Sequence, residues 1–472
     1  MSEAVVVGSG PNGLTAACLL AEQGISVTVI EAAERPGGGT RSTELTLPGL
    51  IHDECAAIHP MGVASPAFEA LGLERYGVEW LWPEVDVAHP LDDGPGGAMY
   101  RSVERTAEGL GEDGPAWLSA FRANAEAFGE LREEILGPIV HFPRRPLELA
   151  RFGLPSLRSA ESYARRFSTD RGRALFAGSA AHSFRPLSAP MSASIGTALI
   201  TAGHAFGLPV ARGGTQAIAD ALLVLAAERG VTVETGRRVG DLGELGSPDL
   251  VLLDLAPQGV LELARGRLPG RIERAYRRYR YGPGSFKLDL AVEGGIPWKD
   301  EACRKAGTVH VGGSIEEIAI AEAEINRGRM PERPFVLVGQ QYLADPSRSV
   351  GDLHPLWIYG HVPSAWPGDA TDAILDQVER FAPGFRERIR ATFTRSTLEF
   401  PRYNENYVNG DIAVGENSAR QLLFRPRIGL DPYSTGMPGV FICSQATPPG
   451  GGVHGMCGWH AARRAIRHLE RA

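Results

Sequence analysis

The stretch that decides the fold is Ala4-Val5-Val6-Val7-Gly8-Ser9-Gly10-Pro11-Asn12-Gly13, in which a short apolar run leads directly into the pattern G-x-G-x-x-G. Such a run is typical of a strand buried on both faces of a parallel sheet. Residues 14–23 predict a helix that stops at Gly24, and residues 25–30 predict a second strand that ends at Glu31. This order of strand, glycine loop, helix, strand and acid is that of a dinucleotide-binding βαβ unit.

Each part of this unit has a physical role. Gly8 would form the tight turn, Gly10 would let the backbone approach a pyrophosphate, and Gly13 would let the helix pack close to the strand. The free N–H groups and partial positive charge at the helix N-terminus favour bound phosphates. Glu31 stands 18 residues after Gly13, where a carboxylate can bind ribose hydroxyls; it disfavours a 2′-phosphate and hence NADP.

Two further glycine clusters bear on the choice between FAD and NAD. Residues 34–42 could contact a pyrophosphate from its other side through backbone and arginine groups, although a plain surface loop is the alternative. Residues 447–455 precede an amphipathic helix expected over 456–469. This second G-x-G-x-x-G match is not followed by a strand and an acid, so we expect a helix N-terminus directed at a flavin ring, or a simple strand-to-helix turn.

Composition narrows the function classes. The chain has 472 residues, a net charge of −8, and 43% hydrophobic and 22% charged residues, which is ordinary for a globular protein and unlike a nucleic-acid-binding surface. It shows no unbroken apolar run of about eighteen residues and no cleavable leader, so we expect a cytoplasmic protein without an integral membrane segment. The five cysteines form no CxxC pair and no Cys/His cluster has ligand spacing, which predicts reduced thiols and no metal site.

Taken with several later segments, these motifs resemble the phytoene desaturase-like flavoproteins, which lie within the glutathione-reductase-type superfamily that also includes amine oxidases. The resemblance covers nearly the whole chain. The matching residues are 8–13, Glu31, 37–42, 52–60, 212–216, 281–287, 307–310, 357–363, 406–412 and 448–456.

The resemblance implies an α/β fold whose Rossmann-type FAD-binding domain is assembled from separated segments. Those segments would be 1–95, 205–265 and 418–472. Residues 96–204 would form a helical cap, and residues 266–417 the mixed sheet of a substrate domain.

It also implies FAD as the cofactor and a set of residues around it. The expected cofactor-binding residues are Gly8, Gly10, Pro11, Asn12, Gly13, Glu31, Ala32, Arg35, Gly38, Gly39, Thr40, Arg41, Val239, Gly452, Val453, His454, Gly455 and Met456. The candidate catalytic residues are His59, His361 and His454, each of which could instead be a hydrogen-bonded structural histidine. Trp357, Tyr359 and His361 alternate along a predicted strand and should face one way. Cys457 is a weaker candidate for a covalent flavin link.

The activity expected from this resemblance is FAD-dependent dehydrogenation, in which hydride passes from a substrate C–H bond to flavin N5. C–C desaturation of a small organic substrate comes first; an amine-oxidase-like reaction that forms C=N bonds, a flavin-dependent isomerase, or a structural FAD are the alternatives. Because no second nucleotide-binding unit is found, electrons should leave to an external acceptor such as oxygen, a quinone or a redox protein. Peripheral membrane contact stays open.

Overall fold

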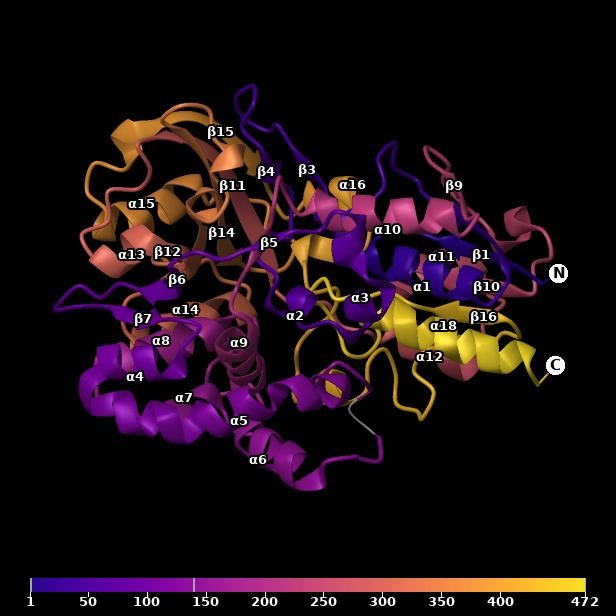
Figure 1. Ribbon diagram of the computed structural model, residues 1–472, viewed down its shortest axis with the longest axis horizontal. Helices are drawn as coiled ribbons and strands as arrows, with labels where there is room; N and C mark the ends of the chain where they lie inside the picture. Colours follow the sequence, from indigo (N-terminus) through magenta and orange to yellow (C-terminus); the bar gives the residue numbers. More distant parts are fainter. Residues whose placement is uncertain (1, 139–140, 472) are drawn as a thin grey trace.

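Two β-sheets lie at opposite ends of the molecule, and both chain termini lie beside the first of them (Figure 1). The computed structural model describes residues 2–138 and 141–471. The first sheet is parallel, with strand order β16-β10-β1-β2-β9. Its strands are β1 (Glu3–Val7), β2 (Ser26–Ile30), β9 (Thr232–Glu234), β10 (Leu250–Leu253) and β16 (Val440–Ile442).

Helices cover both faces of this sheet because its strands are apolar on both faces. On β1, Ala4 and Val6 pack in one apolar core, whereas Val5 and Val7 pack in another on the opposite face. The helices of the first core are α1 (Pro11–Glu22), α10 (Gln216–Glu228) and α18 (Met456–Leu469); those of the second are α11 (Pro257–Ala264) and α12 (Gly270–Arg277). The three layers confirm the α/β fold expected from the first thirty residues.

The second sheet is mixed, with strand order β15-β11-β14-β13-β12-β6-β7. Its ladders are antiparallel except for the pairing of β12 with β6. The strands are β6 (Val85–His89), β7 (Gly97–Met99), β11 (Gly284–Glu293), β12 (Ala306–Val311), β13 (Val336–Gly339), β14 (Leu353–Val362) and β15 (Ile389–Arg395). This is the mixed sheet expected for the substrate domain.

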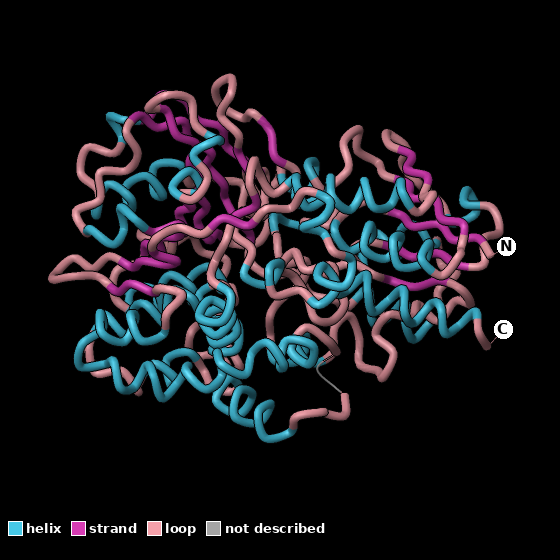
Figure 2. The backbone as a smooth tube through the Cα atoms, viewed as in Figure 1, coloured by secondary structure: helices cyan, strands magenta, loops and turns pink. Residues whose placement is uncertain are grey.

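A layer of helices lies below the second sheet in the view of Figure 2, where it forms most of the cyan region at the lower left. Its core is built from large aromatic side chains, among them Trp117, Phe121, Phe167 and Phe176, all of them buried. The helices are α4 (Val103–Leu110), α5 (Gly114–Ile135), α6 (Pro146–Ser156), α7 (Ala160–Ala164), α8 (Asp170–Ala181) and α9 (Ala193–Phe206). No helix among the described residues is both long and apolar enough to cross a bilayer.

Two boundaries differ from the sequence-based division. Helix α12, expected in the substrate domain that would begin at residue 266, packs on the first sheet through Ile272 and Tyr276. Residues 85–95 were expected in the FAD-binding part, but β6 pairs in parallel with β12 and therefore belongs to the second sheet. The change of sheet follows from a long-range strand pairing that no local pattern marks. Shorter elements complete the chain: α2 (Pro60–Val63), α3 (Pro66–Leu71), α13 (Glu301–Lys305), α14 (Ile315–Asn326), α15 (Thr371–Phe381), α16 (Phe400–Tyr403), α17 (Ala419–Leu423), β3 (Ser42–Thr43), β4 (His52–Asp53), β5 (Trp80–Leu81) and β8 (Val210–Ala211).

Candidate active site

One continuous cavity of about 940 Å³ extends from the carboxyl ends of β1, β2 and β10 to the face of the second sheet. Ligands of open α/β sheets bind at the carboxyl ends of the strands, and this volume is in the range of ligand pockets. We call the two parts the loop end, lined by residues 8–12, 30–33 and 237–240, and the sheet end, lined by Thr308, His310, Leu337, Trp357 and Tyr359.

The glycines of the loop end are required by close backbone approaches. Gly8 has a φ of +101°, a conformation that favours glycine. A Cβ added to Gly13 would collide with the carbonyl oxygen of Gly8, so the first turn of α1 can meet β1 only without a side chain there. A Cβ on Gly10 would lie 2.6 Å from Oδ2 of Asp254. Gly8, Gly10, Pro11 and Asn12 line the cavity, whereas Gly13 lies behind them.

Glu31 lies at the mouth of the loop end, and hydrogen bonds fix its carboxylate. The backbone N–H and the hydroxyl of Ser9 donate to Oε2 at 2.8 and 2.6 Å, and the N–H of Ala33 donates to Oε1 at 2.9 Å. Ala32 and Val239 line the same part of the cavity. Both oxygens of the carboxylate therefore accept hydrogen bonds from the protein, and Glu31 lines the loop end.

Asp254 is a residue of the loop end that the sequence reading missed. It follows β10, and its Oδ2 accepts a hydrogen bond from the N–H of Gly13 at 3.1 Å. Burial, and the negative charge of Glu31, raise the pKa of Asp254 to about 7. An ionisable carboxyl group therefore lies directly beside the glycine loop.

The glycine cluster over residues 37–42 adjoins the first glycine loop, since the N–H of Gly37 donates to the carbonyl of Ser9 at 3.1 Å, and it extends the wall of the loop end. Gly38, Gly39, Thr40 and Arg41 line the cavity. Thr40 donates its hydroxyl to the carbonyl of Gly37 at 2.7 Å, which closes a tight turn. The guanidinium of Arg41 donates to the carbonyls of Gly38 and Tyr403, at 3.0 and 2.7 Å. Arg35 instead donates to the carbonyl of Ser42 at 2.9 Å and does not line the cavity among the described residues.

The C-terminal glycine loop lines the cavity through residues 449–454. His454 is held as a neutral imidazole, because burial lowers its pKa to about 4 and its Nδ1 accepts the N–H of Met456 at 3.0 Å. Its Nε2 is buried without a hydrogen-bond partner in the described part of the chain. Gly455 and Met456 start α18, which packs against α1, and are not part of the cavity lining that the structure describes.

Cys457 lies behind the C-terminal loop. Its thiol donates to the carbonyls of Thr447 and Gly450, at 3.4 and 3.3 Å. Burial raises the pKa of this thiol to about 12, so it stays protonated at neutral pH. A buried, protonated thiol turned toward backbone carbonyls does not favour a covalent link to a cofactor.

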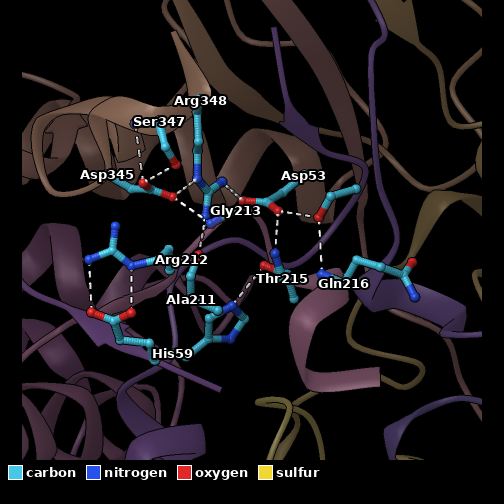
Figure 3. A network of polar contacts seen from close by, with 12 residues as sticks. Asp53, His59, Ala211, Arg212, Gly213, Thr215, Gln216, Asp345, Ser347 and Arg348 are labelled. Atoms are coloured by element: carbon cyan, nitrogen blue, oxygen red, sulfur yellow. Dashed lines mark hydrogen bonds and ion pairs between the residues drawn. The ribbon is translucent and has the colours of Figure 1, made fainter. Parts of the chain in front are cut away.

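The structure places His59 in a polar network beside the cavity rather than in the described lining (Figure 3). Its Nε2 forms a 2.8 Å hydrogen bond with the hydroxyl of Thr215, and burial lowers its pKa to about 4. The N–H of Thr215 in turn donates to Oδ1 of Asp53 at 2.7 Å. In this position His59 supports the loop before α10.

Arg348 is the centre of this network and is almost fully buried. Its guanidinium forms ion pairs with Asp53 at 2.5 Å and with Asp345 at 3.1 Å, and it donates to the carbonyl of Ala211 at 2.7 Å. Figure 3 shows the side chain pointing between the two carboxylates. The network thus ties the first segment, the loop before α10 and the substrate domain to one another.

His361 also lies next to the described lining and not in it. On β14, Trp357, Tyr359 and His361 share one face, as their alternation predicts; Trp357 and Tyr359 line the cavity. His361 is beyond them, where its Nδ1 bonds Oε1 of Glu322 at 2.6 Å and its ring stacks on Phe184 at 3.8 Å. The strand face was predicted, but the cavity ends before its last member.

The sheet end has mainly apolar walls. Helices α2 and α9, the loop after α9 and strands of the second sheet supply them; the lining includes Met61, Val87, Met99, Leu199, Ile200, Leu208 and Leu337. Two histidines that the sequence reading did not single out, His182 and His310, also line this end. His182 follows α8 and His310 lies on β12, so only the fold brings them together.

Comparison with known proteins agrees with this geometry. Residues 6–71 match the family described as NAD(P)-binding Rossmann-like domain. The chain is 29% identical over 248 residues to hydroxyneurosporene desaturase of Rubrivivax gelatinosus, which covers 49% of this chain and 46% of the desaturase. It is 23% identical to pyridine nucleotide-disulfide oxidoreductase domain-containing protein 2 of Mus musculus, over 99% of this chain and 94% of that protein.

Among solved structures, cyclohexylamine oxidase from Brevibacterium oxydans aligns over 100% of both chains with a TM-score of 0.56 and 15% identity. At that identity the likeness concerns the fold alone. The chain spans less than half the length of the carotenoid desaturases that it matches. Similarity over nearly the whole chain is therefore found with the mouse protein, in sequence, and with the oxidase, in fold.

Proposed function

We propose that this chain, which is similar to desaturases and to the mouse oxidoreductase domain-containing protein, is a phytoene desaturase-like, FAD-dependent dehydrogenase of an apolar organic substrate. The observation that carries the proposal is the continuity of the cavity. The same cavity contacts Glu31 and Val239 at the loop end and Trp357 and Tyr359 at the sheet end. A cofactor bound at the first end can therefore reach a substrate at the second.

The residues of the loop end fit FAD. Glycine at position 10 keeps free the space that a Cβ would take up in front of Asp254. Asn12 lines the cavity, and its Oδ1 is buried without a hydrogen-bond partner among the described residues. The N-terminus of α1 and the turn over residues 37–40 would hold the pyrophosphate from two sides, and Glu31 would bind the ribose. Bound there, FAD would supply the hydride acceptor, flavin N5.

The pKa of Asp254 makes this binding depend on pH. The folded value of about 7 lies above the ordinary value for Asp, so the carboxyl group is neutral in acid and gains a negative charge as the pH rises through about 7. We expect the FAD affinity of the wild-type protein to fall severalfold from about pH 6 to about pH 8, because that charge repels the pyrophosphate. Titration of apoprotein with FAD at each pH measures the change.

Asp254→Asn should bind FAD with nearly the same affinity across this range. Asp249→Asn, at the opposite end of β10, serves as the matched control and should retain the pH dependence of the wild type. An equal fall of affinity in all three proteins would show that Asp254 is not the titrating group.

The chain's own residues then act by position and by excluding water. The apolar walls of the sheet end would hold a C–H bond in place and keep the reacting carbon dry. None of the described residues that line this end is Asp or Glu, so no carboxylate is present to pair with an ammonium group. These walls favour C–C desaturation of an apolar molecule.

A second candidate is an amine-oxidase-like reaction that forms a C=N bond. The ring of Trp357 meets that of Tyr359 at 5.1 Å and 85°, and two such rings could receive an amine. The likeness of the fold to cyclohexylamine oxidase fits this alternative. Flavin-dependent isomerisation without net electron transfer is the third reading.

The proposal is tested by mixing FAD-loaded protein, without oxygen, with apolar hydrocarbon-like compounds and, separately, with amines. We expect saturated or partly saturated apolar compounds to bleach the visible absorbance of the oxidised flavin, and the product to contain a new C=C bond by mass spectrometry. Bleaching by amines alone would favour the second candidate. Product formation only after prior reduction of the flavin, with no net oxidation, would favour isomerisation and contradict dehydrogenation.

We also propose that the electrons leave to an external acceptor, and that the protein works in the cytoplasm. The absence of a second dinucleotide unit in the sequence supports the first point. Reoxidation rates with oxygen, a soluble quinone and a one-electron acceptor would identify the class of acceptor.

A further inference from the structure

The sheet end contains a polar pair set in apolar walls. Nε2 of His182 and Nε2 of His310 are 3.0 Å apart, and the two rings meet edge to face with centroids 5.0 Å apart. Both residues line the cavity. Thr308 lines it as well, two residues before His310 on β12, and Ser179 lines it from α8. Four polar side chains therefore gather at one place in an otherwise apolar chamber.

The two imidazoles are neutral. Burial lowers the pKa of His182 to about 3 and that of His310 well below its ordinary value. The nearby His361 already has a partner, since its Nδ1 bonds Oε1 of Glu322 at 2.6 Å. Because a neutral imidazole has one N–H and one lone pair, the 3.0 Å contact uses the hydrogen of one ring and the lone pair of the other.

Several polar atoms around this contact have no hydrogen-bond partner. The hydroxyl oxygen of Thr308 is buried without a hydrogen-bond partner among the described residues, and so is Nδ1 of His310. Nδ1 of His310 is turned toward α8, where a Cβ on Gly178 would lie 2.7 Å from it and 2.9 Å from Nδ1 of His89, so His310 contributes to the chamber by holding His182. Nδ1 of His182 has no such partner there either, and His182 is only partly buried. Buried polar atoms are normally hydrogen-bonded, so those of Thr308 and His182 point to a bound group. The described residues offer no group of three His, Cys, Asp or Glu that could hold a metal ion.

We propose that His182, His310 and Thr308 form a subsite for one hydroxyl group of an otherwise apolar substrate. A hydroxyl suits this subsite because it donates and accepts, and so completes the pair whichever ring nitrogen carries the hydrogen. A carboxylate or phosphate would be poorly bound, since neutral imidazoles in an apolar chamber do not compensate its lost hydration. The inference rests on the proposed function and adds the substrate class, an apolar alcohol.

The position of the subsite implies that the hydroxyl is an anchor and not the reacting group. Tyr359 pairs with Leu337, and Leu337 pairs with His310, so the three lie in a row across β14, β13 and β12. Neighbouring strands are about 4.8 Å apart, which puts His310 about 10 Å from Tyr359 along the sheet. A substrate held by its hydroxyl at His310 would extend along the apolar wall toward Trp357 and Tyr359.

The test compares alcohols with the hydrocarbons of the same skeleton. FAD-loaded protein is titrated with 1-decanol, 3,7-dimethyl-1-octanol and menthol, and with decane, 2,6-dimethyloctane and p-menthane, and binding is followed by the flavin spectrum and by tryptophan fluorescence. We expect at least one alcohol to bind about tenfold more tightly than its own hydrocarbon. Decanoate, as an anion, should bind more weakly than 1-decanol.

His182→Phe and His310→Phe should each remove this preference, and His182→Asn, which restores a donor and an acceptor, should recover part of it. Retained FAD absorbance and an unchanged melting temperature identify the variants that are folded. One folded Phe variant, at either position, is enough for the test. Equal binding of every alcohol and its hydrocarbon by the wild type would overturn the proposal, as would an alcohol preference that survives in the folded Phe variant.

The proposed dehydrogenation and the proposed hydroxyl subsite can be contradicted independently of each other. Alcohol binding without flavin bleaching by any substrate would contradict dehydrogenation and leave the hydroxyl subsite standing. Flavin bleaching by apolar compounds, with no tighter binding of alcohols than of their hydrocarbons, would support dehydrogenation and contradict the hydroxyl subsite.

Discussion

Gly13→Ala is expected to weaken FAD binding by at least about a hundredfold. The added Cβ would collide with the carbonyl oxygen of Gly8, and neither backbone can move without opening the contact between β1 and α1. The N–H of Gly13 would also lose its 3.1 Å hydrogen bond to Asp254. Displacement of the loop removes the amide groups that would face the pyrophosphate, and each lost charge-assisted hydrogen bond costs about 1.5–3 kcal/mol. Two such losses account for the expected effect.

Gly24→Ala is the matched control, because Gly24 follows the same helix at its other end. Its φ of +73° imposes a conformational penalty on alanine that the helical Gly13 does not carry, but open space surrounds its Cβ position. This variant should lose some stability, on the order of 1 kcal/mol, and bind FAD like the wild type. Equal affinities in Gly13→Ala and Gly24→Ala would show that the loop geometry does not govern binding.

Arg348→Met is expected to destabilise the folded protein by about 3–5 kcal/mol, the range found when one partner of a buried ion pair is removed. Methionine fills a similar volume but leaves the carboxylates of Asp53 and Asp345 without their cation. The carbonyl of Ala211 loses its donor as well. Urea denaturation followed by tryptophan fluorescence measures the change in the free energy of unfolding.

Arg212→Met tests the same substitution at an exposed ion pair in the same region. Arg212 and its partner Glu79 are each about half exposed, so we expect little or no loss of stability. Comparable losses in the two variants would contradict a special role for the buried network.

The network also predicts a loss of stability in acid. Burial raises the pKa of Asp53, but Arg348 and the donors Thr215 and Ser42 outweigh burial and hold this pKa below its ordinary value. The contribution of Asp53 is thus fully present above the ordinary Asp pKa of about 4, and is lost as the pH falls below it.

Local sequence signals predicted the first part of the fold well. The apolar run before Gly8, the glycine spacing and Glu31 lie within thirty residues of one another, so one βαβ unit fixes their relative positions. The structure accordingly places Gly10 and Glu31 on the same cavity. The alternation of Trp357 and Tyr359 likewise predicted their shared strand face.

Residues brought together by distant pairings were missed. Asp254 reaches the glycine loop only because β10 pairs with β1, about 250 positions away in the chain. His182 and His310 are 128 positions apart and meet through the packing of α8 near β12. For the same reason the boundary at residue 95 was misplaced, since β6 leaves the first part of the chain to pair with β12.

Cofactor uptake decides whether one FAD lies along the cavity from Glu31 toward Trp357. Apoprotein stripped of cofactor is titrated with FAD, and the bound flavin is quantified from its visible spectrum after gel filtration. We expect one FAD per chain, with quenching of tryptophan fluorescence, and strongly reduced uptake when Glu31 is replaced by Arg in a folded variant. A wild-type protein that stays colourless, or a Glu31→Arg variant that binds FAD equally well, would contradict this expectation.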